Sequence, residues 1–220
     1  MGLPVLVIGP SGAGKTYGLK NFSPEEIGVI GVEKTRLPFR SKIKVVSLPE
    51  SFGDDNASPA KINLARYSWI LNVIQKSKAK SIAIDDSQYL LANELFDRCN
   101  EVGYTKFNNM ASNFRNLIHF VNKQAADDKI VYFLHHSEDD AEGRKKAKTV
   151  GKMLDEKLVI EGCFNVVLYC VDHKFYTQAN GTSTAKTPED MFSSIEIQND
   201  LKAVDVAIRE YYGMSIEGGA

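Results

Sequence analysis

The chain has few cysteines and no long apolar segment. Its three cysteines, Cys99, Cys163 and Cys170, form no C-x-x-C pair. An odd number of scattered thiols argues against a disulfide framework and is typical of a reducing compartment, where such thiols are buried as small apolar side chains. The apolar run before Gly9 is too short for a signal peptide or a membrane span, and Met1-Gly2 lacks the Ser or Thr at position 6 that myristoylation requires. We therefore expect a cytoplasmic protein that contacts no membrane and has no N-terminal accessory domain.

An excess of charge of one sign is also missing. Lys and Arg number 27 and Asp and Glu number 28, which gives a formal net charge of −1. A surface for nucleic acid would therefore be a local patch, because no global positive field attracts anions to the molecule. Apolar residues make up 43% and charged residues 25% of the chain, which is typical of a globular protein. We expect one domain over residues 1–220, with a flexible tail from about residue 213.

The most informative feature is a glycine-rich motif that follows an apolar run at residues 5–8. It fits the pattern G-x-x-x-x-G-K-[ST] and consists of Gly9, Pro10, Ser11, Gly12, Ala13, Gly14, Lys15 and Thr16. A glycine-rich turn between a buried strand and a helix lets successive backbone N–H groups surround a phosphate at the positive end of the helix dipole. Lys15 would reach the β- and γ-phosphates, and the Thr16 hydroxyl would bind Mg²⁺. With Tyr17, these residues are the expected binding set for ATP; a glycine-rich turn without a ligand is the alternative.

Apolar periodicity predicts strands and helices in alternation. Strands are expected over residues 5–8, 27–32, 44–48, 81–84, 130–134, 164–171 and 174–178, and helices over 15–21, 60–76, 90–100 and 108–126. Polar or charged loops are expected over residues 50–59 and 138–148. This order predicts an α/β fold of the P-loop NTPase type, in which helices cover both faces of a mostly parallel central sheet.

Two adjacent acids follow the apolar strand at residues 81–84. Ligands bind at the carboxyl ends of the strands in such sheets, and Asp85 stands where a Walker B carboxylate orients Mg²⁺ or its coordinated water. Thr16 and Asp85 are therefore the expected metal ligands. Asp86 is either a second acid of the metal site or the N-cap of the next helix.

Two further strands end in residues that suit catalysis. Glu33 follows the strand at residues 27–32, which we expect beside the strand of the loop or one place away from it. A carboxylate there would polarise the water that attacks the γ-phosphate; a solvated charge is the alternative. His135 and His136 follow residues 130–134, where one of them would contact the γ-phosphate and report its hydrolysis, unless it is a buried core histidine. A metal site is not expected there, because adjacent strand residues point to opposite faces.

The succession of phosphate loop, Glu33 strand, Asp85 strand and His pair resembles the ATPase core of RecA and RadA proteins. It resembles in particular the phage-encoded, core-only RecA-like ATPases, AAA-family ATP-binding proteins that include the Sak-type single-strand annealing recombinases. The resemblance spans nearly the whole chain, and residues 185–192 are similar to the Lys-containing segment at RecA subunit boundaries. It implies a homo-oligomer whose catalytic residues are Lys15, Glu33, Asp85, His136 as γ-phosphate sensor and Lys186.

Lys186 would serve the nucleotide of a neighbouring subunit, because negative charge that builds on the γ-phosphate is best met by a cation arriving on assembly. A surface lysine without a role is the alternative.

In that fold, loops after the Walker B and sensor strands hold DNA. The candidate contacts here are Lys106, Arg144, Lys145, Lys146 and Lys148, with Tyr104 and Phe107 close in sequence to the first. Clustered cations beside aromatic rings suit single-stranded DNA, through phosphate neutralisation and base stacking. Acidic residues at 138–142 offset the positive charge of the cations at 144–148, so a solvated loop that binds no DNA is the alternative. The basic run from Lys34 to Lys44 is a second candidate.

The expected function is that of a Mg²⁺-dependent ATPase acting on single-stranded DNA in phage recombination or replication, by annealing or strand exchange, in the cytoplasm of the bacterial host. Two alternatives remain open at the level of sequence. One is a nucleotide switch that loads a phage replication protein or docks on a phage single-strand-binding protein. The other is a small-molecule P-loop kinase, which would need an arginine-rich lid, whereas the cations of the polar loops are mainly lysines.

Overall fold

The structure, a computed structural model, describes residues 1–33, 36–52 and 56–215. Lys34, the first residue of the basic run, and most of the expected tail, residues 216–220, lie outside the described residues. Gly213, where we expected the tail to begin, is the left-handed residue that ends the last helix. No described helix is long and apolar enough to cross a membrane.

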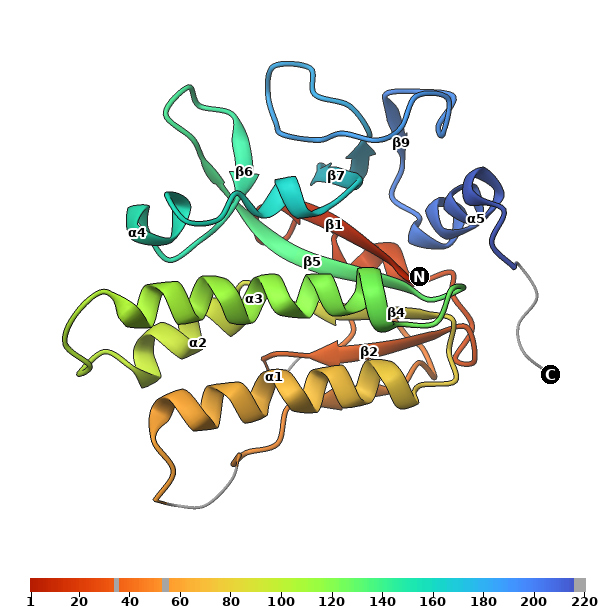
Figure 1. The fold of residues 1–220 in the computed structure, drawn as a ribbon. Helices are drawn as coiled ribbons and strands as arrows, with labels where there is room; N and C mark the ends of the chain where they lie inside the picture. The colour runs from red at the N-terminus through yellow and green to blue at the C-terminus, as the bar shows by residue number, and fades with distance from the viewer. Residues whose placement is uncertain (34–35, 53–55, 216–220) are drawn as a thin grey trace.

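One sheet organises the described chain (Figure 1). Its strands are β1 (Leu3–Gly9), β2 (Ile27–Gly31), β3 (Val45–Ser47), β4 (Ser81–Asp85), β5 (Ile130–Asp139), β6 (Lys145–Ala147), β7 (Val166–Val171), β8 (Lys174–Tyr176) and β9 (Glu196–Gln198). They are ordered β3-β2-β4-β5-β1-β7-β8-β9, with β6 paired to β5. The pairs from β3 to β7 are parallel, and those of β8 with β7 and β9 are antiparallel. The expected α/β class with a mostly parallel sheet is confirmed.

Helices cover both faces of this sheet. On one face lie α1 (Pro59–Lys76), α2 (Tyr89–Asp97) and α3 (Thr105–Gln124), which Figure 1 shows side by side. The inner face of α3 carries four buried apolar residues, Phe114, Leu117, Ile118 and Val121. The other face carries α5 (Leu201–Tyr212) and the one-turn helix η1 (Thr16–Leu19). The short α4 (Lys152–Asp155) and η2 (Ile160–Cys163) connect β6 to β7.

The helix expected at residues 15–21 is wrong in kind and length, because η1 is a single 3₁₀ turn of four residues. Tyr17 and Gly18 are poor helix formers. Gly18 is buried, and a Cβ there would lie 2.6 Å from Asn199 Oδ1. The turn is therefore packed closely against the side chain of Asn199. A single turn aligns few peptide dipoles, so phosphate binding here would depend on the loop's own N–H groups and on Lys15.

The expected end of the fifth strand and the loop after it are also wrong. β5 continues through His135 and His136 to Asp139, and residues 145–147 return along it as β6. Opposite charges face each other across this hairpin, Glu138 against Lys146 and Asp139 against Lys145, and such cross-strand pairs stabilise antiparallel strands. The segment is therefore a β-hairpin and not a loop.

The position expected for the Glu33 strand is wrong as well. Both β4 and β5 lie between β2 and β1, so β2 is three places from β1, the strand that precedes the glycine-rich loop. Its neighbours are β3 and β4. This order brings Glu33 to the Asp85 strand instead of to the loop strand.

Candidate functional site

The loop after β1 has a shape that requires its glycines. Gly12 and Gly14 have φ of +76° and +104°, in the region that side chains rarely adopt. A Cβ on Gly14 would lie 2.4 Å from Asn199 Nδ2 and 2.6 Å from His173 Nδ1. A Cβ on Gly9 would lie 2.3 Å from the carbonyl oxygen of Cys170. The loop is thus packed closely against the segments that follow β7 and β9.

Lys15 lies inside this loop. Its side chain is only 6% exposed, and its Nζ donates hydrogen bonds to the carbonyl oxygens of Gly9 at 2.8 Å and Pro10 at 2.9 Å. Burial lowers the pKa of the Lys15 amine, and the charges of Cys170, Asp86 and Asp85 oppose that change. The loop therefore holds an amine whose partners are neutral carbonyl groups, and an anionic ligand would be a stronger acceptor for it.

The two residues expected to bind Mg²⁺ are in contact. Thr16 Oγ1 donates a hydrogen bond of 2.8 Å to Asp85 Oδ1. Asp85 is 1% exposed, and its second oxygen, Oδ2, is buried without a hydrogen-bond partner. Burial raises the pKa of Asp85 to about 6, against the effect of the Thr16 hydroxyl. An unpartnered buried carboxylate oxygen is costly unless a cation or water meets it.

No group of three or more His, Cys, Asp or Glu side chains that could hold a metal ion is found among the described residues. A magnesium ion bound with a nucleotide takes one protein hydroxyl, one carboxylate, phosphate oxygens and water. Thr16 and Asp85 are a hydroxyl and a carboxylate of the kind that such an ion would take.

Asp86 faces the histidine pair. Its backbone is left-handed, with φ of +60°, and its Oδ1 lies 3.3 Å from His136 Nε2. The hydrogen bond from His136 lowers the pKa of Asp86. The expected N-cap alternative is wrong, since α2 begins after Gln88 without a side-chain cap. A non-glycine residue in this conformation at the end of a central strand is typical of functional sites.

The two histidines have different surroundings because they point to opposite faces of β5. His135 is fully buried; its Nε2 donates to the carbonyl of Lys148 at 2.7 Å, and its Nδ1 accepts from Ser87 Oγ at 2.9 Å. Burial lowers its pKa to about 4, so it is a neutral core residue. His136 is partly exposed, its ring and that of Tyr89 meet edge to face, and its backbone N–H donates to Gln88 Oε1. Only His136 shares the edge that carries Asp86.

Glu33 lies at the same edge of the sheet. The N–H of Val32, the residue before it, donates to the carbonyl of Asp85 at 3.2 Å. The exposed Glu33 side chain accepts a hydrogen bond from Asn93 Nδ2 of α2 at 3.0 Å. β2 and β4 thus bring Glu33, Asp85 and Asp86 to one edge, and Asn93 fixes the position of the Glu33 carboxylate.

Lys186 does not approach the loop of its own chain. Its backbone exchanges two hydrogen bonds with Val167 of β7. Val167 is level with Leu6, three residues before Gly9, and three residues of strand span about 10 Å. The side chain is exposed.

Most of the candidate DNA contacts are already engaged within the chain. Lys106 Nζ donates to three carbonyls at the end of α2, those of Arg98, Cys99 and Glu101. In the β5–β6 hairpin, Arg144 pairs with Asp140 and Glu142, Lys145 with Asp139, and Lys146 with Glu138 and Asp155. Lys148 is exposed, and no described acidic side chain lies within ion-pair distance of it. The hairpin is thus a charge-balanced surface with one available cation.

Three residues that support the loop were not anticipated from the sequence. Cys170 Sγ and the N–H of His173 both donate to the carbonyl of Ala13, at 3.3 and 3.2 Å, and Asn199 Nδ2 donates to the carbonyl of Gly14 at 2.9 Å. The signal for His173 was available, since only two residues separate the strands expected at 164–171 and 174–178, the spacing of a tight hairpin. Nothing local marks Asn199, which lies 185 residues from Gly14.

A cavity of about 1000 Å³ lies elsewhere. It lies at the amino ends of the strands, beside the first residues of β2 and between the second half of α1 and α5. Trp69, Lys44 and Lys76 are among its lining residues. It contains none of the residues of the phosphate loop.

A scan against protein-family models finds no match to this chain, and a search of curated proteins finds no similar sequence.

Proposed function

We propose that the protein binds ATP with Mg²⁺ on the loop at residues 9–17 and hydrolyses it, as a P-loop ATPase with a RecA-like core. The observation that carries this proposal is the 2.8 Å hydrogen bond between Thr16 and Asp85, which are 69 residues apart in the chain. Both were expected as Mg²⁺ ligands from separate motifs. The buried Asp85 Oδ2 without a partner fits a cation or its coordinated water at this place.

Each residue of the edge has a role in this proposal. Lys15 would donate to the phosphate oxygens, and Thr16 and Asp85 would hold Mg²⁺, which supplies positive charge against the β- and γ-phosphates. Glu33, held by Asn93, would accept a proton from the attacking water. His136, paired with Asp86, would contact the terminal phosphate. It would transmit the loss of that phosphate on hydrolysis to the β5–β6 hairpin, whose paired residues begin directly after it.

The order of the strands supports the RecA-like part of the proposal. Parallel β2, β4, β5 and β1 end side by side, and Glu33, Asp85, His136 and the phosphate loop all lie at that edge. In a homo-oligomer, the exposed Lys186 would serve a neighbour's site, since it does not reach its own.

Steady-state hydrolysis tests the central proposal. We expect turnover of ATP that requires Mg²⁺ and rises several-fold when single-stranded DNA is added, measured by release of inorganic phosphate. Turnover that persists in excess chelator would contradict the metal site. Mg²⁺-dependent turnover that DNA leaves unchanged, with no ATP-dependent binding of DNA, would remove the role in recombination or replication and retain the ATPase.

A nucleotide switch that loads a phage replication protein is the second candidate. One observation favours it: Lys15 donates to carbonyls of its own loop and Glu33 accepts from Asn93, so two reactive groups of the site have protein partners that turnover would have to displace. Such a protein would bind ATP but turn it over only after its partner protein is added.

For the proposed contact with single-stranded DNA, we expect Lys148 to contribute more than its neighbours. Lys148→Ala should weaken binding of a labelled oligothymidylate about three- to tenfold and lower the salt slope of the affinity by about 0.7, the value for one lost phosphate contact on a single strand. Lys145→Ala is the matched control, expected within about twofold of wild type because Lys145 is already paired with Asp139. Fluorescence anisotropy over a series of salt concentrations measures both. Equal effects of the two substitutions would contradict the hairpin assignment.

A further inference from the structure

Aromatic side chains gather on one flank of the phosphate loop. Tyr17, directly after Thr16, places its ring edge-on to Phe39 of the β2–β3 connection, with ring centroids 6.2 Å apart. The ring of Tyr17 also meets His173 of the β7–β8 turn edge-on, at 5.7 Å. Tyr17 and Phe39 are half-buried and His173 is exposed. Three segments distant in sequence thus form one partly accessible aromatic surface, called here the aromatic flank.

The backbone fixes His173 against the loop. Asp172 and His173 are the two residues between β7 and β8, and both are left-handed, with φ of +49° and +57°. Two consecutive left-handed residues make the tight turn whose twist matches antiparallel strands. The N–H of His173 donates to the carbonyl of Ala13, and its ring occupies the space that a side chain on Gly14 would need. The ring is therefore held at the loop and not free in solvent.

The flank also has a cation. Lys20 Nζ lies 4.3 Å from the centroid of the Tyr17 ring and donates to the Tyr17 hydroxyl at 3.2 Å. An exposed amine over one face of a tyrosine ring is attracted to the ring by about 0.5–1 kcal/mol, which leaves the other face for a further contact.

The aromatic flank has members from both sides of β1: Phe39 comes from the β2–β3 connection, and His173 lies on the side of β1 away from the acidic edge. Asp85, Asp86 and His136 come from β4 and β5, on one side of β1 in the sheet, and His173 comes from the β7–β8 turn on the other. A nucleotide likewise has two chemically different ends, an anionic phosphate chain and a heteroaromatic base. Phosphates that reach the acidic edge through Thr16 would leave the aromatic flank, which begins at the next residue, Tyr17, for the base.

We propose that Tyr17, Phe39 and His173 form the site for the nucleotide's base, and that ring contacts there add to the affinity given by the phosphate loop. This inference rests on the proposed function. Contact of a base with aromatic side chains contributes about a tenfold or larger factor in affinity and tolerates different bases, because every base has a π-face. The site should therefore accept nucleotides as a class over bare polyphosphates and discriminate weakly between adenine and guanine.

Comparison of ATP with inorganic tripolyphosphate, each with Mg²⁺, separates this site from the phosphate loop. Calorimetry on the wild type should give ATP an affinity at least about tenfold above that of tripolyphosphate. Tyr17→Leu and His173→Asn should each lower the ATP affinity several-fold to about tenfold, and leave tripolyphosphate within about twofold. Asn is chosen at position 173 because it tolerates left-handed backbone and has no ring.

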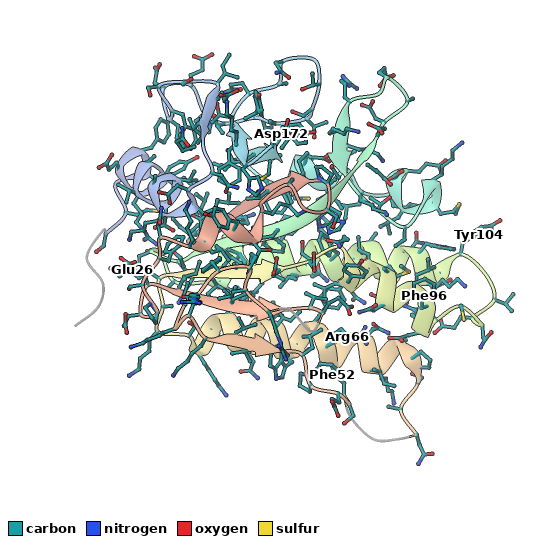
Figure 2. The ribbon with its side chains drawn as sticks, turned by 180° about the vertical axis from the view of Figure 1, so that it is seen from behind. Glu26, Phe52, Arg66, Phe96, Tyr104 and Asp172 are labelled. Carbon is teal, nitrogen blue, oxygen red and sulfur yellow. The ribbon has the colours of Figure 1, made fainter. Side chains whose placement is uncertain are left out.

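Tyr104→Leu is the matched control, since Tyr104 is 71% exposed and Figure 2 shows it well separated from Asp172 at the β7–β8 turn. It should bind both ligands as the wild type does. Equal wild-type affinities for ATP and tripolyphosphate, or variants that lose both ligands in parallel, would overturn the base site and leave the proposed phosphate-loop function standing. A wild type that binds neither ligand would overturn both.

Discussion

Replacement of Asp85 by Asn is expected to lower Mg²⁺-dependent ATP hydrolysis by at least about a hundredfold and to stabilise the ligand-free protein. The first effect follows from the loss of the carboxylate that would hold the ion with Thr16. The second follows from burial: Asp85 is 1% exposed, and one of its oxygens has no hydrogen-bond partner. Asparagine keeps an acceptor for the Thr16 hydroxyl and removes the buried charge.

The pH dependence of the stability difference identifies this cause. Burial raises the pKa of Asp85 from 3.8 to about 6, so the folded state binds the proton more tightly than the unfolded state. The carboxylate therefore costs stability above pH 6, and this cost disappears as the pH falls from about 6 to about 4. D85N should be more stable than the wild type by about 1–3 kcal/mol at pH 7–8, with little difference near pH 4.

Urea unfolding in the presence of a chelator measures this difference across the pH range, and Asp86→Asn is the matched control. Asparagine tolerates the left-handed backbone of Asp86. The hydrogen bond from His136 lowers the pKa of Asp86, so that charge stabilises the folded state above its unfolded pKa and its removal should cost stability. Two results would contradict the assignment of Asp85 as a buried carboxylate that costs stability. One is a stability gain in D85N that does not vary between pH 4 and 7, and the other is the same gain in D86N.

Features of the site that depend on short sequence patterns could be predicted. Gly9 to Thr16 and the apolar strand before Asp85 are local signals, and the structure puts Thr16 and Asp85 in contact. The parallel sheet followed from the alternation of apolar runs with helical periodicity, because strands buried on both faces need continuous apolar residues.

Features that depend on strand order or pairing could not be predicted. Nothing in residues 27–32 shows that two strands separate β2 from β1, because that order results from crossover connections and not from composition. The choice between His135 and His136 needed the register of β5, since a shift of one residue exchanges the buried and exposed faces. The ion pairs of the β5–β6 hairpin were hidden for the same reason: they form only once Glu138 and Lys146 face each other.

The helix expected after the loop fails for a different reason. A glycine-rich loop before a short polar segment predicts a helix by analogy, but Tyr17 and Gly18 have low helix propensity and the segment ends before Ser23-Pro24. Tertiary contact with Asn199, 185 residues from Gly14, then fixes the loop from outside. A site so supported depends on the β7–β9 region, which the motif alone would not indicate.

Glu33→Gln is expected to lower kcat by at least about a hundredfold and to leave the affinity for nucleotide within about twofold. General bases contribute roughly 10²–10⁴ to the rates of hydrolytic enzymes. Glutamine keeps the size of the side chain and an oxygen that can accept from Asn93, so position is preserved and only the capacity to take a proton is lost. Since Glu33 is exposed, the free energy of unfolding should change by less than about 0.5 kcal/mol.

Single-turnover hydrolysis and equilibrium nucleotide binding, measured on the same preparation, separate the two parameters. Glu210→Gln, at an exposed glutamate of α5, is the matched control and should behave as the wild type in both. Asn93→Ala should lie between them, with kcat lowered about five- to tenfold, because it removes the hydrogen bond from Asn93 and keeps the carboxylate. Wild-type turnover in E33Q would exclude Glu33 as the base. Asp86, a further acid at this edge among the described residues, would then be the next candidate for the base, and Asp86→Asn should abolish turnover while nucleotide still binds.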